Sequence, residues 1–164
     1  MRQGNRAVEK IIKREALIAW RNRLRLVSRS IAFTNGVFDI LHQGHIKVLT
    51  EAASFADVLI VGVNSDASVK RLKGPERPIN DEQSRACLLS SLVMVDAVVI
   101  FEEDTPLNII NIIKPDILIK GGDYSVDQIA GSREVQAYGG TVEIIQMAQG
   151  FSTTGIIDKL KSLQ

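Results

Sequence analysis

The two histidines of the chain lie three positions apart, in the segment His42-Gln43-Gly44-His45. If a helix begins near Gln43, both imidazoles project from its first turn on neighbouring faces. The free amides of a first helical turn attract anions, and two imidazoles add hydrogen-bond donors directed at the same place. Gly44 leaves room where a phosphate group has to approach the backbone closely. The pattern therefore favours a phosphate-binding site.

Two other interpretations of the histidine segment are open. Both imidazoles could satisfy backbone groups inside the fold without binding any ligand. Alternatively, Asp39, His42 and His45 could form a metal site, since their ligand types fit, but the sequence offers no further histidine or suitable cysteine nearby. We favour phosphate binding over both and expect no metal ion held by the protein itself.

A second candidate phosphate cradle, the segment Phe151–Gly155, precedes a helix that we expect near residues 154–163. Ser152, Thr153 and Thr154 can cap this helix while leaving its free amides for an anion. Capping alone explains one hydroxyl side chain, whereas three in succession are more than a cap requires. The apolar residues expected to face the core are Ile156, Ile157, Leu160 and Leu163.

Short apolar runs alternate with helical patterns along the chain. The predicted strands are brief, rich in Val and Ile and apolar at consecutive positions, as expected for strands covered on both faces: Ile31–Phe33, Val58–Val63, Ala97–Phe101, Ile117–Ile119 and Val142–Ile145. The predicted helices lie near residues 44–54, 81–92, 105–113, 131–138 and 154–163. This alternation predicts a doubly wound α/β fold with a mainly parallel, five-stranded sheet. Ligands of such sheets bind outside the carboxyl ends of the strands.

An extra amino-terminal helix is predicted over residues 6–26, within an extension at 1–28 that packs on a single domain spanning 1–164. Leu17, Trp20 and Leu24 recur at helical spacing, and Trp20 is expected to be a packing anchor. The apolar stripe of this helix could also serve a homodimer or a higher homo-oligomer.

The overall composition argues against several classes of protein. A net charge of only +1 gives no support for a general nucleic-acid or membrane binder. No apolar stretch approaches the ~20 residues of a membrane span, and the first residues lack the apolar region of a signal peptide. Cys87 is the only cysteine, which excludes an internal disulfide and suits the cytoplasm. Because it lies in an apolar helical run, we expect it to be buried.

The segment Lys70–Asn80 is predicted to be a loop, because it holds Gly74 and two prolines among four basic side chains. Long loops in compact domains are often functional. Lys73 and Arg77 are therefore expected to contact the phosphate of an acceptor substrate, although a solvated surface is the alternative.

The segment Lys120–Tyr124 directly follows a predicted strand and contains the pair Gly121-Gly122. Paired glycines let the backbone approach a flat ligand closely, which suits a nucleobase and ribose. A plain tight turn is the alternative.

The motif Gly36–Asp39 followed by His42–Lys47 resembles the HxGH signature of the cytidylyltransferase-like nucleotidyltransferases. The resemblance continues in the expected order through nearly the whole chain: Asn64–Asp66, Arg71–Gly74, Arg77–Asn80, Glu103–Pro106, Lys114–Asp116, Lys120–Tyr124 and Ser152–Thr154. Together these motifs are similar to one branch, the heptose 1-phosphate adenylyltransferases of lipopolysaccharide precursor synthesis. In some bacteria that activity is fused behind a sugar kinase, for which 164 residues leave no room, so we expect the stand-alone form.

The resemblance implies roles for individual residues. It assigns contacts with the triphosphate and the transition state to His42, His45 and Lys47. It assigns nucleotide binding to Thr34, Asn35, Gly36, Phe38, Arg85, Lys120, Gly121, Gly122, Asp123, Ser152, Thr153 and Thr154. It assigns the second substrate to Asp39, Asn64, Asp66, Lys73 and Arg77. For Arg85 the alternative is a solvated surface arginine.

The implied reaction joins ATP to D-glycero-D-manno-heptose 1-phosphate and releases pyrophosphate, with Mg²⁺ carried by the nucleotide. The rival functions are a cytidylyltransferase that uses CTP with glycerol 3-phosphate or a similar phosphate, and a non-catalytic nucleotide-binding regulator. One departure concerns Lys13, which stands where chains of the heptose branch often have a hydroxyl cap for the first helix. That departure puts the start of the amino-terminal helix in doubt.

Overall fold

A computed structural model of the chain describes residues 6–146 and 152–163. Its centre is a sheet of five parallel strands in the order β3-β2-β1-β4-β5. The strands are β1 (Ile31–Gly36), β2 (Val58–Asn64), β3 (Ala97–Phe101), β4 (Ile117–Gly121) and β5 (Thr141–Ile145). The chain builds from β1 outward to β3 and then crosses back to β4, so the direction of winding reverses between β1 and β4. The predicted doubly wound, parallel α/β fold is confirmed.

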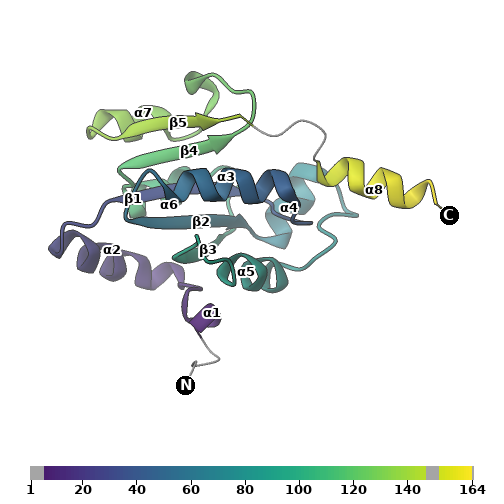
Figure 1. Ribbon diagram of the computed structural model, residues 1–164, viewed down its shortest axis with the longest axis horizontal. Coiled ribbons are helices and arrows are strands. Elements are labelled where there is room, and N and C mark those ends of the chain that lie inside the picture. Colours follow the sequence, from purple (N-terminus) through teal and green to yellow (C-terminus); the bar gives the residue numbers. More distant parts are fainter. Residues whose placement is uncertain (1–5, 147–151, 164) are drawn as a thin grey trace.

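Helices cover both faces of this sheet (Figure 1). The helices on one face are α3 (Gln43–Ala53) and α5 (Glu82–Ser90), and those on the other are α2 (Leu17–Leu26), α6 (Leu107–Ile113) and α7 (Ser132–Ala137). On the first face Leu49 and Leu89 are fully buried. On the second face Leu17, Ile110 and Val135 pack with the sheet. Two apolar layers therefore hold the strands, as their runs of Val and Ile require.

The observed strands contain all of the predicted runs and extend them with polar or small residues. β1 continues through Thr34, Asn35 and Gly36, and β4 continues through Lys120 and Gly121. The additions to β1 and β4 lie at carboxyl ends, where apolar packing gives way to the edge that binds ligands in such sheets.

The structure contains α4 (Asp66–Lys73), a helix that the sequence analysis missed. The predicted loop at Lys70–Asn80 is therefore wrong in its first four residues. The Ser65 side chain caps α4 by accepting a hydrogen bond from the amide of Ser68. Because Ser68 and Val69 are the only buried residues of this helix, its apolar periodicity is too weak to reveal it.

The predicted continuous helix over residues 6–26 is also wrong. The chain forms α1 (Arg6–Glu9), a 3₁₀ turn η1 (Arg14–Ala16) and α2, with extended backbone between α1 and η1. The amide of Ile12 donates a hydrogen bond to the carbonyl of Val98, and the amide of Val98 donates one to the carbonyl of Lys10, both at 2.8 Å. Lys10–Ile12 thus covers the open edge of β3, and the bonds gained there replace helical ones.

Two expectations about burial are corrected by the structure. Cys87 is exposed, because α5 turns Ala86 and Leu89 toward the core and presents Cys87 to the opposite side. The helix α8 (Thr153–Lys161) has no buried residue, and Leu160 is 58% exposed, so its apolar side does not face the core. Among the described residues, none of the helices combines the length and the apolar character needed to cross a membrane.

Candidate active site

The turn between β1 and α3 places the histidine segment at the carboxyl edge of the sheet. Phe38 adopts a left-handed backbone conformation with φ of 51°, which turns the chain out of β1. His42 is the extended N-cap residue of α3, and its side chain accepts no capping bond. His45 lies in the first turn, and the Phe38 ring packs against it with centroids 5.2 Å apart. The helix start expected near Gln43 is therefore observed.

The imidazoles of His42 and His45 stack on each other, with ring centroids 3.8 Å apart and planes 22° apart. Burial lowers the pKa of His42. Burial and the neighbouring charge of His42 lower the pKa of His45 to about 4. Both rings are therefore neutral near pH 7 in the free protein, and each can donate one hydrogen bond. The Nδ1 atom of His45 is buried and has no hydrogen-bond partner among the described residues, which does not fit a purely structural role for this ring.

The structure does not bring Asp39 to the histidines as a metal ligand. Its Oδ1 atom accepts bonds from the amides of Ile79 and Asn80 at 2.8 and 2.9 Å. Its Oδ2 atom accepts one from Arg77 at 2.7 Å. Burial by itself raises the pKa of this carboxyl, but these three donors hold it below its usual value. Asp39 and Arg77, both predicted to bind the second substrate, form an ion pair with each other in the free protein.

A cavity of about 540 Å³ opens beside His45. It adjoins a smaller cavity of about 160 Å³, because six lining residues are common to both. The shared residues include Asn35, Gly36, His45 and Lys120. The two cavities span the carboxyl ends of β1 and β4, where the direction of winding reverses, and this is the usual ligand position in such sheets.

Several predicted residues line these cavities. Those on the nucleotide side are Thr34, Asn35, Gly36, Phe38, Lys120 and Gly121. Those assigned to the second substrate are Asn64 and Lys73, which line the larger cavity. The amide of Asn64 is fixed by a 3.0 Å hydrogen bond to the Ser68 hydroxyl. The sequence thus located the walls formed by β1, β4 and the α3 turn, and about half of all the residues that line the two cavities.

Lysines approach the histidine segment from two sides. Lys120 is half-buried, with its Nζ atom 3.5 Å from the carbonyl oxygen of Asn35 and 5.9 Å from the centroid of the Tyr124 ring. Burial lowers the pKa of Lys120. Lys47 is more exposed, and its Nζ atom lies 3.2 Å from the carbonyl oxygen of Gln146 at the end of β5. Both lysines can move a positive charge toward an anion by a change of rotamer.

The Gly121-Gly122 pair has a structural reason of its own. A Cβ atom on Gly121 would lie 2.7 Å from Cγ2 of Val48, so glycine is needed for β4 to end against α3. Gly122 has φ of +129°, which disfavours any side chain. The tight-turn interpretation therefore accounts for these glycines, while Gly121 also lines the smaller cavity. Asp123, assigned to the nucleotide, is exposed beside this turn.

Arg85 is neither solvated nor directed into the cavities, since its side chain is fully buried. Its guanidinium donates to the carbonyls of Val37 and Asn80 at 2.6 and 2.9 Å and to the Asp66 carboxylate at 2.7 Å. The Asp66 amide in turn donates to Glu82 at 2.8 Å. Arg85 and Asp66 thus join the turn after β1 to the segment before α5, and the structure shows them as supports of the site.

The second predicted cradle lies at the amino end of α8, although Phe151 falls outside the described residues. Ser152 caps the helix by accepting a 3.0 Å bond from the amide of Gly155. The Thr153 hydroxyl lies 3.3 Å from the carbonyl of Ile40, in the turn before α3. Thr154 lines a separate groove of about 480 Å³ with Lys73. The two predicted cradles are therefore neighbours, joined through Thr153.

The larger cavity also has walls that were not predicted as site residues. They follow β3 and β4: Asp104, Thr105, Pro106, Tyr124, Gln128, Ile129 and Ala130. Leu72 of α4 completes the wall. The signal that could have found them is position, because each segment comes just after the carboxyl end of a strand in a parallel sheet.

Known proteins are similar to this chain in sequence and in fold. Residues 33–159 match the model of the cytidylyltransferase-like family. The bifunctional protein HldE of Mesorhizobium japonicum is 56% identical over 133 residues, which are 81% of this chain and 27% of the relative. The chain spans less than a third of the length of this relative and of others with the same name, between 27% and 32%.

Two solved structures resemble the fold. A lipopolysaccharide core biosynthesis protein of Thermoplasma volcanium superposes with a TM-score of 0.61 at 36% identity, covering 74% of this chain and 98% of that one. A pantoate–beta-alanine ligase of Francisella tularensis, complexed with beta-gamma ATP and beta-alanine, has a TM-score of 0.62 at 18% identity. The superposition covers 92% of this chain and 76% of the ligase chain. At this low identity the similarity supports the fold alone.

Proposed function

The chain belongs to the cytidylyltransferase-like family of nucleotidyltransferases, and from this premise we propose that it transfers AMP from ATP to D-glycero-D-manno-heptose 1-phosphate. The products are ADP-heptose and pyrophosphate, for the synthesis of a lipopolysaccharide core precursor. The observation that carries the proposal is the stacked pair His42 and His45 at the start of α3, beside a cavity large enough for a nucleotide or a sugar phosphate. The similarity to a lipopolysaccharide core biosynthesis protein supports the choice of acceptor.

The reaction requires positioning and charge stabilisation rather than a protein nucleophile. An oxygen of the sugar phosphate forms a bond to the α-phosphorus of ATP, and the bond from that phosphorus to the bridging oxygen breaks. The electron pair remains on the departing pyrophosphate. Because the attacking oxygen is already ionised at neutral pH, no strong general base is needed. Cys87 plays no part, since it lies exposed on α5.

The protein would stabilise the charge that develops around the α-phosphorus. The neutral rings of His42 and His45 donate hydrogen bonds from a fixed stack, and Lys47 and Lys120 add positive charge from either side. Donors held in place before reaction are more effective than donors that must reorganise. The low pKa of His45 favours its neutral form until a polyanion binds next to it.

Mg²⁺ would accompany the nucleotide and neutralise its phosphate oxygens. Among the described residues, no group of three or more His, Cys, Asp or Glu side chains is arranged to hold a metal ion. We assign the ion's ligands mainly to the phosphates and water, because Mg²⁺ keeps several waters and binds nucleotide phosphates readily. The chain's own contribution is to orient the phosphates.

The second substrate would occupy the part of the larger cavity toward β2 and β3. Asn64, Lys73, Asp104 and Thr105 offer donors and acceptors for a phosphate and for sugar hydroxyls. Lys73→Met should raise KM for the sugar phosphate about tenfold, the effect of losing one charged contact. Lys70→Met is the matched control, because Lys70 lies exposed on the same helix and lines neither this cavity nor the groove beside α8.

The test of the proposed function is pyrophosphate release by the purified chain with Mg²⁺. One reaction contains ATP with D-glycero-D-manno-heptose 1-phosphate, as separate anomers, and a parallel reaction contains CTP with glycerol 3-phosphate. Release only with ATP and the heptose phosphate is the expected result. Release only from the CTP pair would retain the chemistry and replace both substrates. ATP binding without release from either pair would favour a non-catalytic regulator.

A further inference from the structure

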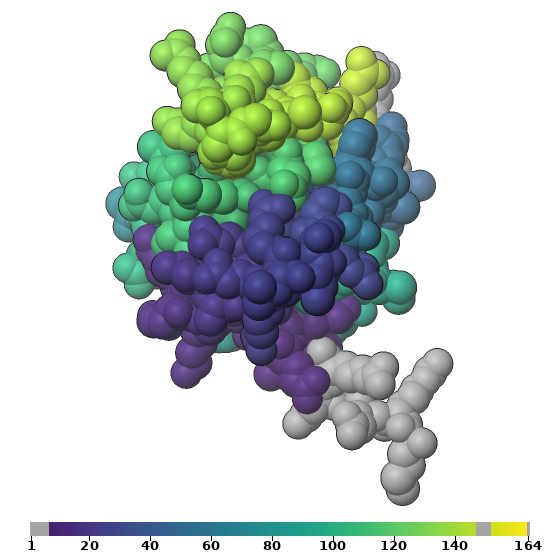
Figure 2. All heavy atoms as spheres, turned by 90° about the vertical axis from the view of Figure 1, so that its left-hand side faces the viewer, coloured from purple at the N-terminus to yellow at the C-terminus, as the bar shows by residue number. Residues whose placement is uncertain are grey.

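A further cavity, of about 320 Å³, lies at the amino edge of the sheet, opposite the histidines. Its lining comes from α2, the end of α6 and the turn after α7: Arg21, Asn22, Arg25, Lys114, Asp116, Tyr138, Gly139 and Gly140. Figure 2 faces this edge and shows the surface of α2, in dark blue, beside the green and yellow-green surfaces of later segments. Ile117 and Thr141, the first residues of β4 and β5, follow directly, so this cavity is separate from the site of nucleotidyl transfer.

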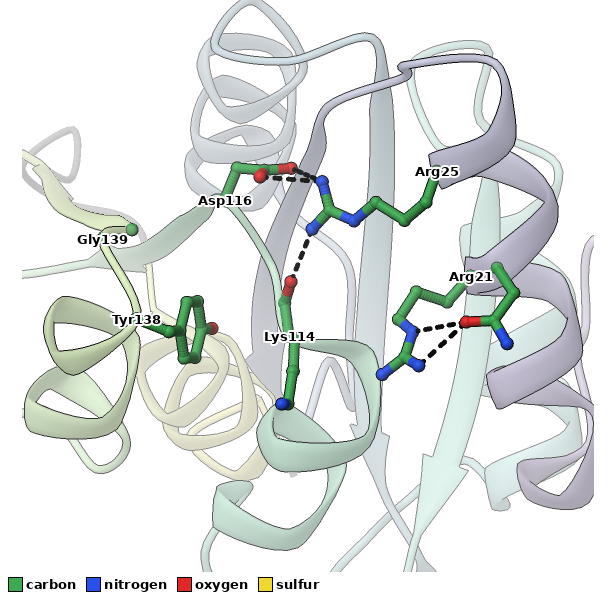
Figure 3. Close-up of a pocket in the computed structure, with 8 residues that line it drawn as sticks. Arg21, Arg25, Lys114, Asp116, Tyr138 and Gly139 are labelled. Atoms are coloured by element: carbon green, nitrogen blue, oxygen red, sulfur yellow. Dashed lines mark hydrogen bonds and ion pairs between the residues drawn. The ribbon is translucent and has the colours of Figure 1, made fainter.

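Three basic side chains face this cavity against one carboxylate. Arg25 donates to both oxygens of Asp116 at 2.8 Å and to the carbonyl of Lys114 at 2.8 Å (Figure 3). Asp116 also accepts a 2.7 Å bond from the amide of Ile31. The charges of Arg25 and Asp116 thus neutralise each other, and the ion pair adds no net charge to this wall of the cavity.

Arg21 and Lys114 keep their positive charge. Among the described residues, the Arg21 guanidinium bonds only to neutral oxygens, the carbonyl of Ile112 at 2.8 Å and the side chain of Asn22 at 2.9 and 3.2 Å. The ammonium of Lys114 has no hydrogen bond or ion pair within the described ranges, and Figure 3 shows its side chain between the Tyr138 ring and the Arg21 guanidinium. A cavity holding two uncompensated cations attracts an anion, which removes their mutual repulsion.

The backbone and the far wall hold this arrangement in place. Lys114 is the C-cap residue of α6 and has a left-handed backbone conformation, with φ of 48° and ψ of 63°. Glycine is the usual residue in this conformation, so the lysine side chain is present despite the preference of the backbone. The Tyr138 hydroxyl donates to the carbonyl of Pro115 at 2.9 Å, which fixes the ring as an apolar wall. Burial and the Asp116 carboxylate raise the pKa of Tyr138 to about 12, so its hydroxyl stays neutral.

We propose that this cavity is a binding site for a phosphate dianion, either free or as the phosphate group of a small metabolite. Arg21 offers a planar guanidinium that suits phosphate geometry, and Lys114 offers a mobile point charge. The volume exceeds that of one phosphate group, and the Tyr138 ring can pack against the remainder of a phosphorylated sugar. The ligand does not compete with ATP, because it binds at the other edge of the sheet.

The test is a titration of the ¹⁵N-labelled chain with inorganic phosphate at constant ionic strength, followed by NMR. The amide signals of Gly139 and Gly140 report on this cavity, and those of the α3 turn report separately on the histidine site. Saturable shifts of the glycine signals are expected in the native chain. The dissociation constant should rise about tenfold in Lys114→Met and in Arg21→Gln. Arg23→Gln, an exposed neighbour on α2 that does not line the cavity, should leave it unchanged.

A second titration with glucose 6-phosphate distinguishes the two sources of the dianion. Tighter binding than inorganic phosphate assigns the cavity to a phosphorylated metabolite, and equal binding assigns it to free phosphate. Lys114→Met is the more secure variant, since the Lys114 side chain makes no bond to the described part of the chain whose loss would unfold it. Glycine signals that do not saturate, or one dissociation constant shared by the native chain and both cavity variants, would overturn the proposal.

Discussion

The amino ends of α3 and α8 are the two predicted phosphate cradles, and they are held in place very differently. The helix α3 buries Val48, Leu49 and Ala52 against the sheet. The helix α8 buries no residue and lies beyond the carboxyl ends of the strands (Figure 1). Its amino end touches the other cradle through the Thr153 hydroxyl, 3.3 Å from the carbonyl of Ile40.

The difference in burial suggests that the two helices contribute to the site in different ways. Side chains on α3 are fixed before any ligand arrives, as charge stabilisation of a transition state requires. A helix without buried apolar contacts has little local stability of its own. We therefore expect the bound triphosphate to organise the α8 cradle against a preformed α3.

The largest expected effect comes from breaking the support beneath α3. Arg85→Ala removes three hydrogen bonds from a fully buried guanidinium and leaves the Val37 and Asn80 carbonyls unsatisfied. The free energy of unfolding, measured with urea, should fall by about 3–5 kcal/mol. The control is Arg71→Ala, whose pair with Asp104 is half exposed and should be worth less than about 1 kcal/mol. Equal losses in both variants would show that the buried network does not support the turn.

Truncating one leucine in each helix compares the two cradles directly. Leu49→Ala on α3 opens a hole in the core and should reduce the free energy of unfolding by about 3 kcal/mol. Leu160→Ala on α8 should change it by less than about 0.5 kcal/mol, because this side chain is mostly exposed. Urea unfolding measures both. A large loss for Leu160→Ala would mean that α8 is packed in solution and would remove the contrast.

The buried imidazole makes the stability of the α3 cradle depend on pH. The pKa of His45 is about 4 in the folded chain and about 6.5 when unfolded, so the unfolded state takes up a proton first as the pH falls. This contribution to stability is complete above pH 6.5 and is lost progressively toward pH 4. Between pH 7.5 and 5 the native chain should lose about 1–2 kcal/mol more than His45→Gln, after allowance for partial exposure. Parallel urea-unfolding curves across this range would contradict the assignment.

The smallest effect is expected at the cap of α8. Ser152→Ala removes the oxygen that accepts the Gly155 amide and should cost the helix about 1 kcal/mol. Because the rest of the fold does not depend on α8, the loss should appear as a several-fold rise, about fivefold, in KM for ATP at unchanged kcat. Ser162→Ala, at the other end of the same helix, is the control. A similar rise in KM for both variants would show that the Ser152 cap has no specific role in ATP binding.

The sequence predicted the regions in which local pattern and tertiary structure agree. The strands were found because central parallel strands are buried on both faces and read as unbroken runs such as Val58–Val63. The histidine segment was found because residue type, spacing and a helix start at Gln43 coincide. The same logic predicted a hydroxyl cap among Ser152, Thr153 and Thr154, and the structure shows Ser152 in that role.

Several of the failures involve partners that are distant in the sequence. The helical spacing near Lys10 was overridden by pairing with Val98 at the edge of β3. Arg85 was assigned to the nucleotide or to the surface, but its partner Val37 lies 48 positions away and becomes visible only in the fold. The wall at Asp104 depends on which strands are neighbours, which the order of elements along the chain does not determine.

The most direct test of nucleotidyl transfer at the histidine pair is the rate of pyrophosphate release in His42→Ala and His45→Ala beside the native chain. Calorimetry with ATP and Mg²⁺ and far-UV circular dichroism would establish that both variants still bind nucleotide and fold. We expect kcat to fall by about 10²–10³ in each variant, the usual effect of removing one preorganised donor to a transition state. Native turnover in both variants would contradict it and would move the chemistry away from α3.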